Sequence, residues 1–270
     1  MRTVRFELLR PGELLEEMKR FSVAYLPVGP LEWHGPHMPF GTDPLDAQAV
    51  ALGIAEKIGG VVFPTLFCGT EAARDPEILR RMGFAQEDLY VVGMDVPRNP
   101  VKSCYFPEEV FGVILRENLR QIISLGFKLV VVVNGHGADG QLATGARLAK
   151  EFTNTSPATV LFTRAMQKLD EEDQQLGHAN ISETSMQMYI SGDSVRLEEL
   201  PPREVPLRTC EWGIADALQF QGKGNPEAVV MHDPRDATAA LGKRYVENGI
   251  ARISAQVLDC YEKLCPPSGQ

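Results

Sequence analysis

A segment rich in histidine and carboxylate, E-W-H-G-P-H-M-P-F-G-T-D, occupies residues 32–43. Glu32 and His34 are separated by one residue, so both side chains point the same way if the chain is extended there. Asp43 follows a turn that contains glycine and proline, which can bring the chain back toward them. Histidine and carboxylate ligands together suit Zn²⁺, Mn²⁺ or Fe²⁺.

Two further segments carry the same residue types. N-G-H-G-A-D at 134–139 places His136 just after an apolar run, between two glycines that let the backbone turn tightly. G-H-A-N-I-S-E-T-S at 177–185 contains His178 and Glu183. An aspartate shared by two ions about 3.5–4 Å apart could hold a hydroxide nucleophile between them. We therefore expect a metal site built from these three segments.

Each candidate also has a purely structural alternative. Asp43 stands just before Pro44, so it could cap the N-terminus of a helix that Pro44 begins. Glu183 could merely start a helix running to Tyr189, and a lone histidine after a strand is often a hydrogen-bonded loop residue. The metal interpretation is favoured because all the candidate ligands lie at chain turns that follow strands.

Hydrophobic periodicity predicts the elements that position these turns. Strands are expected at 22–28, 61–67, 127–133 and 159–163, and helices at 44–57, 107–125, 141–152 and 236–264. The alternation predicts an α/β fold, a single domain over 1–270 with a mainly parallel sheet flanked by helices. Sites in such sheets lie at the carboxyl ends of the strands. Residues 68–106 show no sustained periodicity, which is typical of a functional or partner-contact segment.

Composition narrows the class of protein. The chain has 270 residues, 44% of them hydrophobic and 23% charged, with a net charge of −9. An acidic chain repels phosphate backbones, so we expect no nucleic-acid partner. No apolar run reaches the ~20 residues that a membrane span needs, and the N-terminus does not read as a signal peptide. The five cysteines form no C-x-x-C pair, so we expect free thiols and a cytoplasmic protein.

Four motifs resemble those of the creatininase (creatinine amidohydrolase) family. They are L-P-V-G-P-L-E-W-H-G-P-H-M-P-F-G-T-D at 26–43, N-G-H-G-A-D at 134–139, H-A-N-I-S-E-T-S at 178–185 and D-P-R-D-A-T-A-A-L-G-K at 233–243. The resemblance spans most of the chain, and its first motif is long and specific. It implies a creatininase-like fold and a metal-dependent hydrolase with two divalent ions (Zn²⁺, Mn²⁺ or Fe²⁺) per chain.

The resemblance also implies a role for each candidate. Glu32 and His136 would hold one ion, and His34 the other. Asp43 would bridge the two, and Glu183 would complete the second. Creatininase itself takes a glutamate ligand two residues after the histidine of the N-G-H motif; here that position is alanine, which makes Glu183 the natural substitute. His178 would be the catalytic proton shuttle.

Departures from the family pattern bear on the substrate. The substitutions in the second and third motifs, and an unrecognisable segment at 68–106, argue against creatinine itself. The resemblance then implies an amidohydrolase that acts on another small cyclic or amide-bearing molecule. Its alternatives are a carbon–carbon hydrolase opening a cyclic diketone such as a diketo-inositol, and a metal-binding assembly protein without turnover.

Basic residues of the divergent segment offer either a site for a polar or anionic substrate or simply a solvated surface. They are Arg74, Arg80, Arg81, Arg98 and Lys102. The family's tendency to form rings implies a homo-oligomer, and a small molecule is the expected partner.

Overall fold

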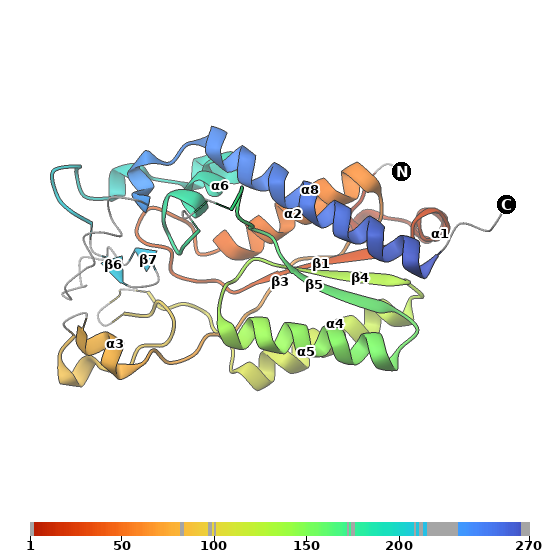
Figure 1. The fold of residues 1–270 in the computed structure, drawn as a ribbon, viewed down its shortest axis with the longest axis horizontal. Coiled ribbons are helices and arrows are strands. Elements are labelled where there is room, and N and C mark those ends of the chain that lie inside the picture. The colour runs from red at the N-terminus through yellow and green to blue at the C-terminus, as the bar shows by residue number, and fades with distance from the viewer. Residues whose placement is uncertain are drawn as a thin grey trace.

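A parallel sheet lies between layers of helices in the computed structural model (Figure 1). The structure describes residues 3–81, 84–96, 99, 101–171, 173, 176–207, 209–210, 213–214 and 232–265. The mainly parallel sheet flanked by helices confirms the fold class predicted from the sequence.

The sheet contains β1 (Val23–Gly29), β2 (Val61–Val62), β3 (Leu66–Phe67), β4 (Leu129–Asn134) and β5 (Thr159–Arg164). Its order is β2-β1-β4-β5, with β3 also paired to β1, and every pairing is parallel. The expectation of one continuous strand at 61–67 is wrong. Pro64 interrupts it, because proline has no backbone N–H to donate to the neighbouring strand.

Helices cover both faces of the sheet. On one face lie α2 (Thr42–Ile58) and α8 (Ala239–Leu264), with α6 (Ile181–Ser191) packed on both; on the other lie α4 (Glu108–Ser124) and α5 (Asp139–Thr155). α1 (Pro11–Arg20) lies toward the end of the molecule where the strands begin. At the opposite end are α3 (Pro76–Arg81) and a small antiparallel pair, β6 (Thr209–Cys210) and β7 (Gly213–Ile214) (Figure 1). Short 3₁₀ turns occupy Phe6–Leu8, Gln86–Asp88, Gly192–Ser194, Leu197–Glu199 and Pro234–Asp236.

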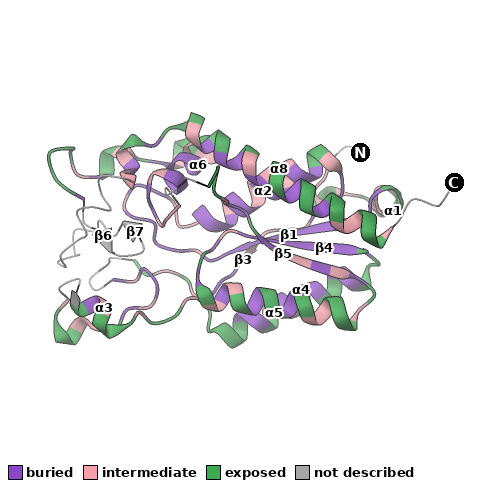
Figure 2. Ribbon diagram, in the orientation of Figure 1, coloured by how far each residue is buried: buried purple, intermediate pink, exposed green. Residues whose placement is uncertain are grey.

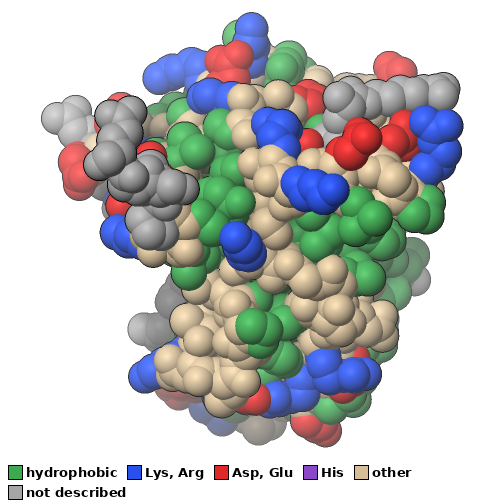
Figure 3. All heavy atoms as spheres, turned by 90° about the vertical axis from the view of Figure 1, so that its right-hand side faces the viewer, with side chains coloured by type: hydrophobic (Ala, Val, Ile, Leu, Met, Phe, Trp, Pro, Cys, Tyr) green, Lys and Arg blue, Asp and Glu red, His purple; other side chains and the backbone are tan. Residues whose placement is uncertain are grey.

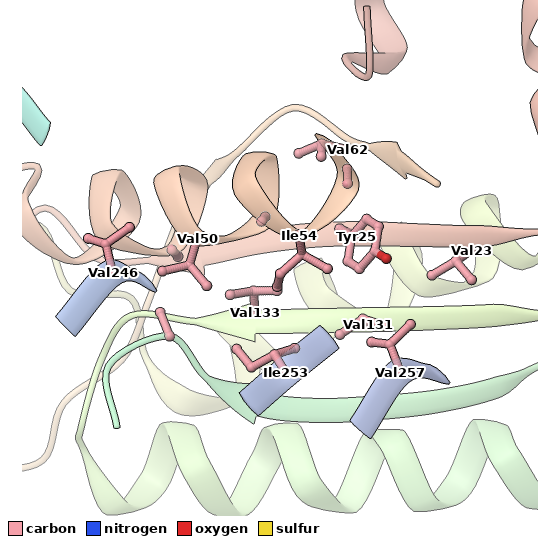
Figure 4. Close-up of a cluster of buried hydrophobic side chains, with 14 of the residues drawn as sticks. Val23, Tyr25, Val50, Ile54, Val62, Val131, Val133, Val246, Ile253 and Val257 are labelled. Atoms are coloured by element: carbon pink, nitrogen blue, oxygen red, sulfur yellow. The ribbon is translucent and has the colours of Figure 1, made fainter. Parts of the chain in front are cut away.

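Side-chain alternation along β1 and β4 builds two separate cores. Val23 and Tyr25 face α2 and α8, whereas Ala24 and Leu26 face α4 and α5. Figure 4 shows the first core, in which side chains from both helices meet those of the two strands. Figure 2 shows these central strands buried along their length. Near-continuous apolar strands are what a sheet covered on both faces requires.

The end of the molecule where the strands begin differs from the end that holds the candidate site. Figure 3 shows Lys, Arg, Asp and Glu interspersed with hydrophobic side chains there, and no histidine is visible on this face. No helix in the described ranges is long and apolar enough to cross a membrane. Cys68, Cys104, Cys260 and Cys265 are free thiols, while the side chain of Cys210 lies outside the described part of the chain.

Helices α6 and α8 approach each other closely at Gly242. A Cβ at this position would overlap the backbone of Ser185 and Met186 in α6. α6 also carries Glu183. The close approach of the two helices that Gly242 allows therefore helps to set the position of that carboxylate.

We predict that Gly242→Ala destabilises the fold by about 1–3 kcal/mol, the usual cost of overpacking. Gly12→Ala is the matched control, because a Cβ at Gly12 in α1 meets nothing within 4 Å. The control should be neutral or stabilising by up to about 1 kcal/mol, since alanine favours helix over glycine. Urea unfolding of both variants checks this, and equal free energies of unfolding would contradict the prediction.

Candidate metal centre

The candidate residues converge at the carboxyl ends of β1 and β4. Glu32 and His34 lie in the turn after β1, and Asp43 lies in the first turn of α2. His136 follows β4. His178 and Glu183 come from a later part of the sequence, with His178 just before α6 and Glu183 in its first turn. Three groups of these side chains have ligand atoms within 4.8 Å of one another, and the three groups together contain all six residues.

One group joins Glu32, Asp43 and His136. Nδ1 of His136 lies 2.8 Å from Oδ2 of Asp43 and 3.1 Å from Oε2 of Glu32. All three side chains are buried, with at most 4% of each residue exposed. Two carboxylates and an imidazole held this close, away from water, form a donor set for a divalent cation.

A second group joins His34, Asp43 and Glu183. Nε2 of His34 lies 3.2 Å from Oδ1 of Asp43 and 3.6 Å from Oε2 of Glu183. Nδ1 of His34 lies 3.0 Å from the carbonyl oxygen of Glu32, to which it donates, and this leaves Nε2 directed into the cluster. The two carboxylate oxygens of Asp43 therefore face different histidines.

His178 is held beside the cluster by the backbone. Its Nε2 donates to the carbonyl oxygen of Trp33 at 2.8 Å, while Nδ1 lies 3.8 Å from Oε2 of Glu32. The ring packs on His34, with 4.2 Å between ring centroids. The next residue, Ala179, has a left-handed φ of 51°, and its N–H donates to Oε2 of Glu183 at 2.6 Å. A costly backbone conformation thus lies between His178 and Glu183.

The loop that carries His136 is fastened to α2. A Cβ at Gly135 would overlap the backbone of Asp43, so only glycine allows the two segments to come this close. Within the loop, Asn134 donates to the carbonyl oxygen of His136 at 2.5 Å, and Gln141 donates to Asn134 at 2.7 Å. His136 and Asp43 are consequently positioned by one rigid unit.

Tyr105 is a site residue that the sequence pattern does not reveal. Its hydroxyl donates to Oε1 of Glu32 at 2.5 Å, which leaves Oε2 directed toward His136. Burial and the nearby Glu32 charge raise the pKa of Tyr105, so it stays a donor. Tyr105 lies at the end of the irregular 68–106 segment, where no periodicity marks it.

A second unpredicted contact ties together the helices that carry Asp43 and Glu183. Nε2 of Gln187 in α6 donates to Oδ1 of Asp46 in α2 at 2.7 Å, and both side chains are buried. Burial, followed by the charges of Glu183 and Asp43, raises the pKa of Asp46 well above its ordinary value. The contact lies about one helical turn beyond each candidate ligand.

The charges of the cluster are strongly coupled. Burial acts to lower the pKa of His34, but the carboxylates of Asp43, Glu183 and Glu32 outweigh it and raise that pKa to about 10. Burial acts to raise the pKa of Glu32, but the neighbouring histidines, His136 foremost, hold it well below its ordinary value. Burial, with the like charges of Asp43 and Glu32, raises the pKa of Glu183 to about 7.

The helix-cap alternative for Asp43 is wrong. α2 begins at Thr42 with Gly41 in the capping position, two residues before the start predicted from Pro44. For Glu183 the structural alternative holds in part: it lies in the first turn of α6, which Asn180 caps by accepting from the N–H of Ser182. The Glu183 side chain nevertheless reaches His34.

A cavity of about 630 Å³ opens onto the cluster. Of the five basic residues considered in the 68–106 segment, Arg74 lines it, but Arg74 is paired with Glu71 at 2.8 Å. Arg80 pairs with Glu77, and Lys102 donates to a backbone carbonyl. The side chain of Arg81 and all of Arg98 lie outside the described residues.

Comparison with known proteins agrees with this geometry. The family model for creatininase, described as creatinine amidohydrolase, matches residues 8–78 and 103–257. The chain belongs to the creatininase family. Members of this family are metal-dependent hydrolases, and the cluster supplies residues that could bind metal.

The individual relatives have low sequence identity to this chain. A mycofactocin precursor peptide peptidase from Mycolicibacterium smegmatis is 26% identical over 233 residues, 81% of this chain and 77% of that protein. A crystal structure of creatinine amidohydrolase (creatininase) has a TM-score of 0.69 at 19% identity, covering 99% of this chain and all of that one. A mutant creatininase of Zn-Zn type has a TM-score of 0.68 at 20% identity, covering 99% of this chain and all of that one. At these identities the structural likeness shows the fold.

His37, the other histidine of the first motif, belongs to none of the three groups found in the described residues. Its Nε2 lies 2.9 Å from the Thr184 hydroxyl. Burial, followed by the charges of His34 and His178, lowers its pKa to about 3.

We predict that His37 makes stability fall as the pH drops. The unfolded chain takes up a proton on His37 below about pH 6.5, whereas the folded chain does not until about pH 3, so protons favour unfolding between these values. By pH 5 the cost should reach about 2 kcal/mol. His37→Gln should show a pH dependence smaller by about that amount, measured by urea unfolding at pH 8 and pH 5. Identical pH dependence in both proteins would count against it.

Proposed function

We propose that this chain is a metal-dependent amidohydrolase that uses two divalent ions, Zn²⁺, Mn²⁺ or Fe²⁺, to hydrolyse a C–N bond next to a carbonyl. One observation carries the proposal: the two carboxylate oxygens of Asp43 face different imidazoles, Oδ1 toward His34 and Oδ2 toward His136. A carboxylate placed between two donor sets suits a bridging ligand.

The residues present fit two ions. Oε2 of Glu32, Nε2 of His34 and Oδ2 of Asp43 are buried and make no well-formed hydrogen bond within the described residues. Buried polar atoms are ordinarily satisfied, so atoms left in this way and turned toward one another call for a shared partner. Glu32, His136 and Asp43 would hold one ion, and His34, Glu183 and Asp43 the other. Such ions supply a Lewis acid that polarises a carbonyl and lowers the pKa of a water.

Hydrogen bonds around the cluster hold the candidate ligands in position. Tyr105 orients Glu32 by donating to one carboxylate oxygen, and the Asp46–Gln187 contact holds the helices of Asp43 and Glu183 together. Partners of this kind typically change metal affinity or activity by about 10- to 100-fold when removed.

His178 is suited to move the proton. Its Nε2 donates to Trp33, so its Nδ1 is the free nitrogen of the neutral ring and is directed toward the cluster. Burial above all lowers the pKa of His178, to about 4, which keeps the ring neutral near pH 7. Nδ1 can therefore accept a proton from the attacking water and pass it to the leaving nitrogen.

The cavity and the relatives support an amide as the substrate. A volume of about 630 Å³ is typical of a site for a small molecule or a few residues of a peptide. A relative matched over most of this chain is named a peptidase, and peptide bonds are amides. Hydrolysis of small amides and peptides, compared with cyclic diketones and measured with metal content on the same sample, tests the choice. Turnover of diketones alone would replace the amide proposal.

We predict about two divalent ions per chain, and we expect Asp43→Asn to lose metal and activity together. The bridging position means that both ions depend on this carboxylate. Asp139→Asn is the matched control, because Asp139 lines the same cavity, begins α5 and belongs to none of the candidate groups in the described part. Elemental analysis and an activity assay check both variants. Normal metal content in Asp43→Asn would refute the bridging role.

We predict that His178→Gln keeps its metal and loses about 10²- to 10⁴-fold in kcat, the usual range for general acid–base catalysis. His37→Gln is the control, since His37 is also buried but reaches Thr184 instead of the cluster. Steady-state kinetics and elemental analysis separate the possible roles. Loss of metal would make His178 a ligand, and full activity would assign proton transfer to another residue.

A further inference from the structure

The wall of the cavity formed by β5 and the segment after it carries two cations that the proposed chemistry does not use. Arg164 is the last residue of β5, and Lys168 follows four residues later. Both line the cavity together with Glu32, Asp43, His136 and His178.

Arg164 is placed close to the candidate centre by the sheet. It pairs with Asn134 in β4, and the N–H of Ala165 donates to the Asn134 carbonyl at 2.8 Å, so the end of β5 is fastened beside the loop that carries His136. The guanidinium reaches that loop. A Cβ at Gly137, the residue after His136, would lie 3.5 Å from Nη2 of Arg164.

No residue in the described part of the chain neutralises either cation. Within the described residues the Arg164 guanidinium and the Lys168 ammonium make no hydrogen bond and no ion pair. Arg74, which also lines the cavity, is different, because Glu71 pairs with it and the carbonyl of Gly93 accepts from it. Asp75 and Asp139 line the cavity as well, yet no ion pair joins either carboxylate to Arg164 or Lys168. Two like charges thus face the same space with no counter-charge from this wall.

Such an arrangement favours an anion in the cavity. Both residues are exposed, so water screens their charges, but the planar guanidinium of Arg164 offers two parallel N–H groups that match a carboxylate. Because Arg164 lies beside the loop that carries His136, an anion bound to it would lie close to the candidate metal centre.

We propose that the substrate carries a carboxylate close to the amide bond that is cleaved, and that Arg164 and Lys168 bind it. The inference rests on the proposed function for the identity of the scissile bond. An acylated amino acid, or a short peptide with a free C-terminal carboxylate, carries a carboxylate next to an amide bond. Arg164 and Lys168 are then specificity-determining residues.

A matched pair of probes tests the proposal on the zinc-loaded protein. N-benzoylglycine and N-benzoylglycinamide share the same secondary amide and differ only in carboxylate against carboxamide. We expect the wild-type chain to bind N-benzoylglycine at least tenfold more tightly, measured by calorimetry. Arg164→Met should remove most of that preference and Lys168→Met part of it, with the affinity for N-benzoylglycinamide unchanged.

Controls separate this site from other sources of affinity. Arg252→Met and Lys150→Met remove exposed cations outside the cavity lining and should keep the full preference. Equal affinity of the two probes in the wild type would overturn the proposal. So would a preference that persists in the Arg164→Met/Lys168→Met double variant, because the carboxylate would then be held by the metals.

Release of benzoate from the same two probes distinguishes this proposal from the proposed function. Arg164-dependent binding without hydrolysis of either probe supports the carboxylate site and counts against amide hydrolysis. Hydrolysis of both probes with equal KM leaves the amidohydrolase intact and overturns the carboxylate site.

Discussion

The burial of three carboxylates against three histidines is the interaction on which the rest of this structure depends. Charged and polar groups removed from water are costly unless they have close partners, and the cluster places carboxylate oxygens and imidazole nitrogens 2.8–3.9 Å apart. The pairing needs segments that are far apart in the chain. Parallel strands bring them together, because every strand of the main sheet ends at the same edge.

Rigidity around the cluster comes from close backbone approach as well as from hydrogen bonds. Gly135 lets the loop after β4 rest on the backbone of Asp43, and Gly242 lets α8 rest on the helix of Glu183. Both contacts act on residues that face His34 or His136. The packing of the helices and the geometry of the candidate metal site are therefore linked, because a shift of either backbone changes the distances between the donor atoms.

Much of this arrangement could be predicted from the sequence. Apolar runs predicted β1 and β4. Three turns that contain histidine and carboxylate predicted the six residues that the structure brings together. The roles of these six residues as ligands and base are proposals. The break at Pro64 and the start of α2 at Thr42 were missed because local rules for proline compete there. Tyr105, Arg164 and the Asp46–Gln187 contact carry no local pattern. They act on the site only through tertiary neighbours, which no spacing in one sequence reveals.

Trp33 gives the outer segment a direct attachment to the centre. Its side chain packs with Leu79, Val91, Met94 and Val96 in a small core of its own, while its backbone lies between Glu32 and His34 and its carbonyl accepts from His178. The family model leaves residues 79–102 unmatched, so much of this small core is built from a segment outside the family match. This segment therefore cannot be exchanged freely for the corresponding segment of a relative. A graft from a relative succeeds only if it fills the space around the indole, because a poorly packed Trp33 would loosen His178 and the neighbouring Glu32 and His34 at once.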